Sequence, residues 1–348
     1  MKKKALTLLL AVVMIMTVAI SAFPASATEA SGNTFSWDDY ATKTDFEIST
    51  AEDLINFLTG VSLDRNFVGK TVKLTKDIVL NDTSSDNWYD NENAYVFTGK
   101  TGYRFAGTFD GQGYEIKGLI IRNTFKSTGE AWQRSSGLFS CVEKGAVVIK
   151  NFTLNGFYVE SDGLQSTAAV VGRADGALTL SGVKVKNGIV KATNCSAVRD
   201  PNSEPNAGVG SLVGQYKVTT ASEKCYLTDC TVEKSVYVES DGSAKVGGIC
   251  GATIAQAYFW YVFTGSRVQP LTSGGYPAPF GSIYVLGATN FRLWDGIASR
   301  YCNEYDVVQK EDYAEKISEF FKEDGYNASN GVLHCYGETA PFVTVEGT

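Results

Sequence analysis

The chain has 348 residues, of which 20% are charged, and carries a formal net charge of −7 at pH 7. An acidic surface repels phosphate backbones, so this balance argues against nucleic acid as a partner. The one histidine, His334, and the lack of any Cys-x-x-Cys pair argue against a cysteine and histidine zinc site. The sequence shows no motif for another metal, for a cofactor or for a catalytic residue.

The N-terminus has the three parts of a secretory signal peptide. Residues 2–4 are lysines, residues 5–20 form an almost unbroken apolar run, and Ala25-Ser26-Ala27 offers a small-residue cleavage site. Removal of residues 1–27 would give a secreted, extracellular protein, free or associated with a cell surface, with no membrane span. The alternative is a membrane anchor, because the apolar run is near the lower length limit for a spanning helix.

A short helix is expected before the first strand. After a predicted linker at residues 28–45, the segment Ser49-Thr50-Ala51-Glu52 fits a capping box, and a helix with one apolar face is expected to end at Gly60. The segment 71–80 then predicts the first strand. Such a helix would cap the end of a stack of strands, where unpaired backbone otherwise invites edge-to-edge association.

The polar loop at residues 81–93 carries two aromatic residues, Trp88 and Tyr89, and Trp132 lies in a second insertion. Aromatic side chains without apolar companions can serve as platforms for sugar rings, so these three residues are the candidate ligand-binding residues. Packing of the loops against the flank of the fold explains them equally well. The acidic residues of the first loop miss the calcium-loop spacing, so a solvated insertion is expected there.

Four segments share apolar residues at positions i, i+3 and i+5. They are Ile116, Leu119, Ile121; Ile149, Phe152, Leu154; Leu180, Val183, Val185; and Leu227, Cys230, Val232. Position i+2 is Gly118, Asn151, Gly182 or Asp229, which are residue types that tolerate tight corners. The last two apolar positions alternate as in a strand, and helical companions at i+4 and i+7 are missing. Each segment therefore predicts a short strand, a corner and another short strand.

A second recurring feature is a short apolar knot flanked by glycine or another small residue. The knots are Gly137-Leu138-Phe139, Ala169-Val170-Val171-Gly172, Ser211-Leu212-Val213-Gly214 and Gly247-Gly248-Ile249-Cys250-Gly251. The hexapeptide Tyr-Val-Glu-Ser-Asp-Gly also occurs twice, at residues 158–163 and 237–242. Repetition at roughly 20–50 residues indicates a solenoid, a propeller or an array. Because the strands are short and no helix or hairpin signal separates them, we expect a parallel β-helix over residues 46–251.

Seven cysteines are present, and an odd number cannot all pair within one chain. Cys230 and Cys250 fall at apolar positions of the repeats, so we expect small buried side chains there rather than reactive thiols. The pairing of the other cysteines stays open.

Several segments resemble, in order, parts of secreted bacterial proteins with GLUG-motif repeats. The resemblance rests on residues 46–57, 69–80 and 105–119. Residues 137–140 and 246–251 look like degenerate copies of the repeat itself. It implies an all-β fold, a right-handed parallel β-helix with a short N-terminal capping helix, and an adhesin-like function. The family motif is structural and implies no catalytic residue.

The chain departs from this pattern after residue 251. We expect residues 252–348 to form a mixed C-terminal region, either a cap or a small appended unit. Within it, the aromatic run at residues 257–263 predicts a buried strand, and residues 311–323 predict an amphipathic helix.

Two functions are compatible with the sequence. The first is a non-enzymatic, adhesin-like protein that binds a polysaccharide or a glycoprotein on a host or neighbouring surface. The second is a carbohydrate-active enzyme on the same scaffold, either a pectin-lyase-like polysaccharide lyase or a hydrolase, which rests on analogy of fold alone. A spacer without a ligand is a third hypothesis.

Overall fold

The computed structural model describes residues 35–124 and 134–251, with gaps at residues 144, 164–165, 195–207, 218–224, 234 and 241–244. Beyond residue 254 it describes the backbone of seven strands. The predicted signal peptide, Trp132 and the predicted helix at residues 311–323 lie outside the described residues.

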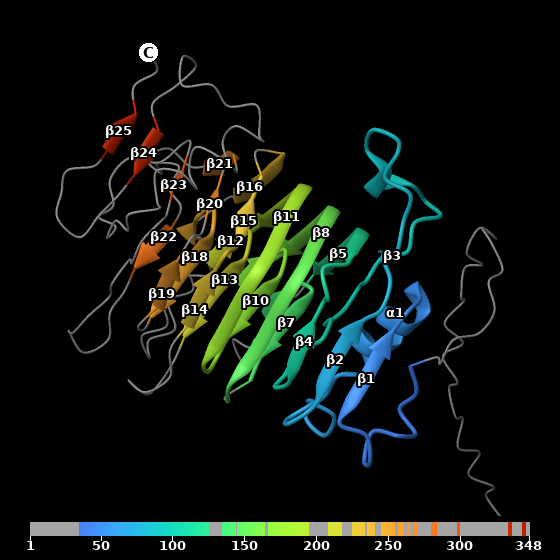
Figure 1. Ribbon diagram of the computed structural model, residues 1–348. Helices are drawn as coiled ribbons and strands as arrows, with labels where there is room; N and C mark the ends of the chain where they lie inside the picture. The colour runs from blue at the N-terminus through green and yellow to red at the C-terminus, as the bar shows by residue number, and fades with distance from the viewer. Residues whose placement is uncertain are drawn as a thin grey trace, which may run out of the picture. The chain divides into compact units, whose positions relative to one another are not determined.

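The described chain is all-β, with three sheets, a short helix and one 3₁₀ turn (Figure 1). The largest sheet, called sheet A, contains β1 (Asp45–Ile48), β2 (Thr71–Leu74), β3 (Ile78–Val79), β4 (Thr108–Asp110), β5 (Glu115–Thr124), β8 (Val147–Asp162), β11 (Leu178–Thr193), β14 (Cys225–Thr228), β15 (Thr231–Val232), β16 (Val236–Ser240), β19 (Ala257–Trp260), β20 (Phe263–Thr264), β21 (Arg267–Pro270), β23 (Ala298–Ser299), β24 (Leu333–Cys335) and β25 (Val343–Val345). Sheet B contains β7 (Phe139–Val142), β10 (Val171–Ala174), β13 (Val213–Lys217), β18 (Cys250–Ile254) and β22 (Phe280–Ile283). Sheet C contains β6 (Ser135–Ser136), β9 (Ser166–Ala168), β12 (Gly208–Gly210) and β17 (Lys245–Val246). The helix is α1 (Ala51–Gly60), and the 3₁₀ turn is η1 (Trp88–Asp90).

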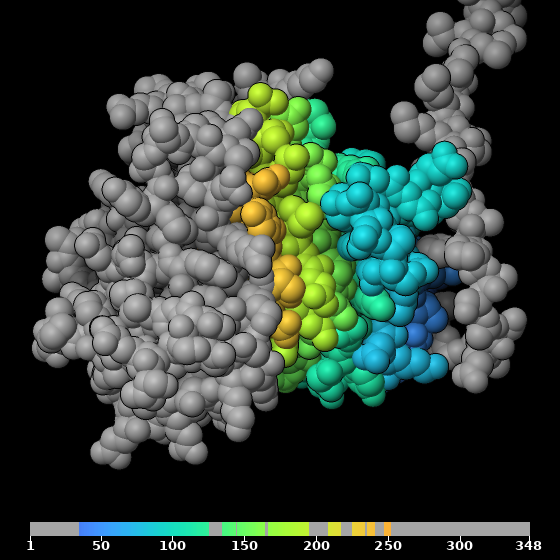
Figure 2. Space-filling model, turned by 90° about the horizontal axis from the view of Figure 1, so that it is seen from above, coloured from blue at the N-terminus to red at the C-terminus, as the bar shows by residue number. Residues whose placement is uncertain are grey.

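The chain visits the three sheets in a recurring order. From β5 to β18 each segment of sheet A is followed by one strand of sheet C and then by one of sheet B. Every described strand pair is parallel, except β23 with β24 and β24 with β25. In Figure 2 the colours follow one another from blue through cyan and green to orange, so consecutive parts of the sequence lie side by side.

The hydrophobic core follows from the alternation of side chains along the strands. Ile149, Leu180 and Leu227 occupy matched positions of β8, β11 and β14, and all three are buried. Each such burial stabilises the fold by roughly 1.5–3 kcal/mol. The intervening side chains of β8 and β11 point away from this core, and most of them are partly or fully exposed; together they make up what we call the outer face of sheet A.

The predicted corners are confirmed at residue level. Gly118, Asn151, Gly182 and Asp229 all have positive φ angles, between 54° and 77°. Asn151 and Gly182 lie side by side between paired residues of β8 and β11, so one corner is repeated from strand to strand. Glycine and asparagine adopt this left-handed conformation most readily, which explains the residue types.

One predicted alignment of the repeats is wrong. Ile116 pairs with Leu154, whereas the sequence pattern aligned it with Ile149. The partner of Ile149 in that direction is Phe109 in β4. The reason is that β8 carries the i, i+3, i+5 apolar spacing twice, starting at Ile149 and again at Leu154. Ile116 could match either start, and in the structure β5 pairs with the second.

The knots are stacked in register. Phe139, Val171, Val213 and Cys250 are aligned across four strands of sheet B. A Cβ atom on Gly172 would lie 2.6 Å from the carbonyl oxygen of Ser136 in sheet C. The knots therefore need glycine because the backbones of sheets B and C approach each other there, with no room for a side chain.

Helix α1 closes the N-terminal end of the core, as predicted, but its cap differs by one residue. Thr50 is the N-cap, and Asp53 completes the capping box in place of the predicted Ser49 and Glu52. Asp53 is fully buried and also accepts the backbone N–H of Phe35 at 2.7 Å. Phe35 lies in the segment predicted as a linker, and it is buried in the core.

The predicted first strand at residues 71–80 is split into β2 and β3, and β1 precedes it as a further strand of sheet A.

At the C-terminal end of sheet A, the aromatic run at residues 257–263 falls on β19 and the start of β20. These two strands continue the parallel pairing of sheet A past residue 251. The predicted domain boundary at residue 251 stays a prediction.

Four cysteines are free and buried: Cys141, Cys225, Cys230 and Cys250. This confirms the expectation for Cys230 and Cys250, and burial raises the pKa of Cys230 to about 12. None of the helices within the described residues is long and apolar enough to cross a membrane.

Candidate functional site

The loop that follows β3, in the connection to β4, is fixed at its base by one side chain. Asn81 donates to the carbonyl oxygens of Tyr95 at 2.9 Å and Gly118 at 2.7 Å, and its own carbonyl oxygen accepts the N–H of Tyr95 at 2.7 Å. One amide thus joins both ends of the loop to β5. We call residues 81–95 the anchored loop.

Arg122 of β5 fixes the tip of the anchored loop. Its guanidinium donates to the backbone oxygen of Tyr89 at 2.9 Å and to the Asp90 carboxylate at 2.7 Å. The ring of Tyr89 stacks on Tyr158 of β8, with ring centroids 4.3 Å apart and planes inclined by only 10°. Because sequence-distant contacts hold both ends, the loop is preorganised against the outer face of sheet A.

Tyr158 forms the floor beneath the loop. It is only 7% exposed, and the Arg122 guanidinium lies 5.2 Å from its ring centroid. Burial, together with the neighbouring Glu160 carboxylate, raises the pKa of the Tyr158 hydroxyl.

Trp88 is the aromatic side chain that the anchored loop presents. It is partly exposed and meets Tyr89 edge to face, with ring centroids 5.9 Å apart. η1, which contains both residues, begins after Asn87 in a left-handed conformation (φ 53°). This turn sets the direction of the loop tip.

An apolar row continues beside the loop on the outer face of sheet A. Ile189 of β11 pairs in register with Tyr158 on one side and with Tyr237 of β16 on the other, and both Ile189 and Tyr237 are partly exposed. Lys191 lies two residues beyond Ile189, and its ammonium is 3.6 Å from the Glu239 carboxylate. The surface therefore combines aromatic and aliphatic groups with fixed ion pairs.

A shallow cleft lies farther along the same face. Its volume is about 720 Å³, and its lining includes Gln112, Asn151, Thr153 and the left-handed Gly182. Thr153 and Tyr158 lie on β8 on the two sides of the corner at Gly156, which has a φ angle of 64°. Amides, a hydroxyl and exposed backbone suit neutral polar ligands rather than ions.

The structure brings together two of the three predicted ligand-binding residues. Trp88 and Tyr89 share the loop tip, but Tyr89 is also a packing residue, which is the alternative that the sequence left open. Trp132 lies outside the described residues. Within the described part of the chain, no group of three or more histidine, cysteine, aspartate or glutamate side chains could hold a metal ion.

Sequence reasoning missed Tyr158 and Tyr237 as site residues, although a signal was present. They are the first residues of the two copies of the repeated hexapeptide. The copies lie on either side of β11, so the repetition places two tyrosines on one face. Arg122 and Ile189 carry no comparable signal.

The described chain thus defines an all-β protein with parallel sheets whose outer face carries an anchored loop. No protein-family model matches it, and no curated protein is significantly similar. A similar solved structure is the 1.30 Å crystal structure of "a putative immunoglobulin A1 protease" from Bacteroides ovatus. The two chains are 12% identical with a TM-score of 0.41, over 80% of this chain and 87% of the other. A likeness at this level supports no inference about activity.

Proposed function

We propose that this protein is a secreted, non-enzymatic, adhesin-like protein that binds glycans through the outer face of sheet A. The observation that carries the proposal is the anchored loop, which Asn81, Arg122 and the Tyr89–Tyr158 stack hold against that face. Binding to a preorganised surface avoids the entropy cost of ordering a loop.

We further propose a right-handed parallel β-helix, resembling proteins with GLUG-motif repeats, as the scaffold. Support comes from the recurring order of sheets A, C and B, from the register-matched knots and from the repeated corners. A β-helix would expose long, regular outer faces, which suit an extended polymer.

A neutral sugar polymer fits the chemistry of the surface. The apolar faces of sugar rings pack against aromatic side chains such as Trp88 and Tyr237. Most charged side chains of the face are already paired, including Lys191 with Glu239 and Lys184 with Glu233. Their remaining lone pairs and N–H groups can bond hydroxyl groups, while their charges largely cancel.

Affinity electrophoresis through gels containing pectic, plant or mucin-type polysaccharides tests this proposal. We expect at least one polymer to retard the protein, and Trp88→Ala to weaken binding about three- to tenfold, since an aromatic contact contributes about 0.5–1.5 kcal/mol. Leu63→Ala is the control, because Leu63 is 52% exposed and lies outside both sheet A and the anchored loop. Equal retardation of the two variants on every polymer would contradict this assignment of the site.

A further inference from the structure

A free strand edge lies at the N-terminal end of sheet A. β1 is the terminal strand, and among the described strands it pairs only with β2. Thr44 and Ile48 accept hydrogen bonds from the β2 side through their carbonyl oxygens. Peptide groups alternate in direction along a parallel strand, so those of Asp45 and Glu47 point to the opposite, unpaired edge.

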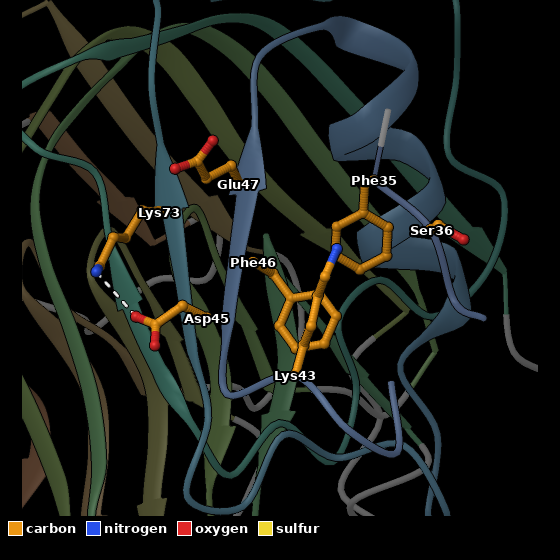
Figure 3. Close-up of a pocket in the computed structure, with 7 residues that line it drawn as sticks. All are labelled: Phe35, Ser36, Lys43, Asp45, Phe46, Glu47 and Lys73. Atoms are coloured by element: carbon orange, nitrogen blue, oxygen red, sulfur yellow. Dashed lines mark hydrogen bonds and ion pairs between the residues drawn. The ribbon is translucent and has the colours of Figure 1, made fainter. Parts of the chain in front are cut away.

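A cleft of about 660 Å³ lies beside this edge (Figure 3). Phe35 and Phe46 form its apolar part, with ring centroids 5.5 Å apart, and both side chains are buried. Lys43 also lines the cleft, and its ammonium is paired with Asp39 at 2.6 Å. In Figure 3 the Phe46 ring lies on one side of β1, whereas Asp45, Glu47 and Lys73 lie on the other. An added strand would therefore meet an apolar surface with one set of alternate side chains and charged groups with the other.

The charged side of β1 continues an alternating row. Glu47, Lys73, Asp110 and Lys150 occupy matched positions of β1, β2, β4 and β8, so negative and positive charges alternate across four strands. The Lys150 ammonium lies 3.1 Å from Asp110. Glu47 ends the row, and it forms no ion pair with any described residue. On a strand added to the free edge of β1, a positively charged side chain opposite Glu47 would therefore be favourable.

The same charges disfavour a second copy of this chain. Antiparallel pairing of two β1 edges, centred on Phe46, would place Asp45 of each copy opposite Glu47 of the other. Like charges directly opposite each other destabilise a strand pair. A short, charged edge strand also disfavours pairing with unrelated strands. Pairing with β1 therefore depends on the charge of the partner strand as well as on its shape.

We propose that the free edge of β1 docks an extended segment of a partner protein, with lysine or arginine alternating with apolar residues, as an added strand of sheet A. Backbone hydrogen bonds to Asp45 and Glu47 supply the pairing. A cation of the segment faces the Glu47 carboxylate, since Asp45 already pairs with Lys73 at 2.9 Å, and the apolar side chains of the segment face Phe35 and Phe46. This surface is separate from the anchored loop, so the two proposals succeed or fail independently.

Fluorescence anisotropy with labelled peptides tests the proposal. We expect the purified chain to bind a Lys-Val-Lys-Val-Lys peptide at least about tenfold more tightly than a Glu-Val-Glu-Val-Glu peptide, with the difference shrinking at high salt. Glu47→Lys should weaken binding of the lysine peptide about fivefold or more. Asp64→Lys is the matched control, because Asp64 is exposed outside both β1 and the anchored loop and should leave binding unchanged.

Two further peptides separate strand addition from charge attraction. Each carries N-methyl groups on alternate residues, in one of the two possible phases, so that only one peptide loses the N–H groups that face β1. We expect one phase to abolish binding and the other to leave it within about twofold. Equal binding of both methylated peptides, equal binding of the glutamate peptide, or an unchanged affinity of Glu47→Lys would each overturn the proposal.

Discussion

Asp53 shows how much one buried carboxylate can organise at the end of the fold. Its two oxygens accept the backbone N–H groups of Phe35, Ser49 and Thr50 and the hydroxyl of Ser49. In return, the backbone N–H of Asp53 donates a hydrogen bond to the hydroxyl oxygen of Thr50. The same side chain thus caps α1 and fixes the segment that carries Phe35 into the core.

Replacement of this carboxylate should be costly. We expect Asp53→Ala to lower the free energy of unfolding by about 2–4 kcal/mol, because it removes a helix cap and leaves the buried Phe35 N–H without an acceptor. Denaturant unfolding followed by circular dichroism measures the change. Glu52→Gln is the control, since Glu52 is exposed in the same helical turn. A loss below about 1 kcal/mol for Asp53→Ala would mean that the cap is not important for stability.

The corner residues could be predicted from the sequence, whereas the N-cap of α1 was predicted only to within one residue. Gly118 and Asn151 stand at fixed offsets from apolar residues, and few residue types adopt a positive φ angle. For the cap, Ser49 with Glu52 and Thr50 with Asp53 both satisfy the pattern. Only the burial of Asp53 beneath Phe35 distinguishes them, and that contact joins residues 18 positions apart.

At the scale of the element, the knots set the spacing between sheets B and C. Gly172 and Gly214 belong to adjacent strands, and a Cβ atom on either would meet backbone atoms of sheet C at 2.6–2.9 Å. Backbone cannot rotate away as a flexible side chain can. The spacing of the two sheets therefore depends on the lack of side chains at these positions.

A methyl group at a knot should be far more destabilising than one elsewhere. We expect Gly172→Ala to lower the free energy of unfolding by about 2–3 kcal/mol through overpacking. Gly99→Ala is the matched control, because Gly99 has no atom within 4 Å of an added Cβ and has no positive φ angle. Thermal unfolding of both variants measures the difference, and equal melting temperatures would contradict the close approach of the two sheets.

Strand register was the element-scale property that the sequence left ambiguous. β8 repeats its apolar spacing at two successive corners, so local pattern alone gives Ile116 two equivalent partners. The choice of Leu154 depends on the neighbouring strands, since β4 already occupies the position beside Ile149. Competition between segments for one partner is a property of the assembled sheet.

At the scale of the whole molecule, the recurring order of the sheets could be expected from the repeats, but the candidate site could only be foreseen in part. Trp88 and Tyr89 stood out as aromatic residues in a polar loop. Their position against Tyr158 depends on a contact between residues about 70 positions apart, held by Arg122. The repeated hexapeptide was the one local signal of the face that receives the loop.

The central claim is that the outer face of sheet A with its anchored loop binds glycans without cleaving them. Its most direct test is the chain length of a polysaccharide recovered after retention on immobilised protein, with Trp88→Ala in parallel. We predict Trp88-dependent retention of at least one polymer, with its chain length unchanged. Shortened chains would contradict the non-enzymatic function and favour a lyase or hydrolase, and retention without dependence on Trp88 would contradict the proposed surface.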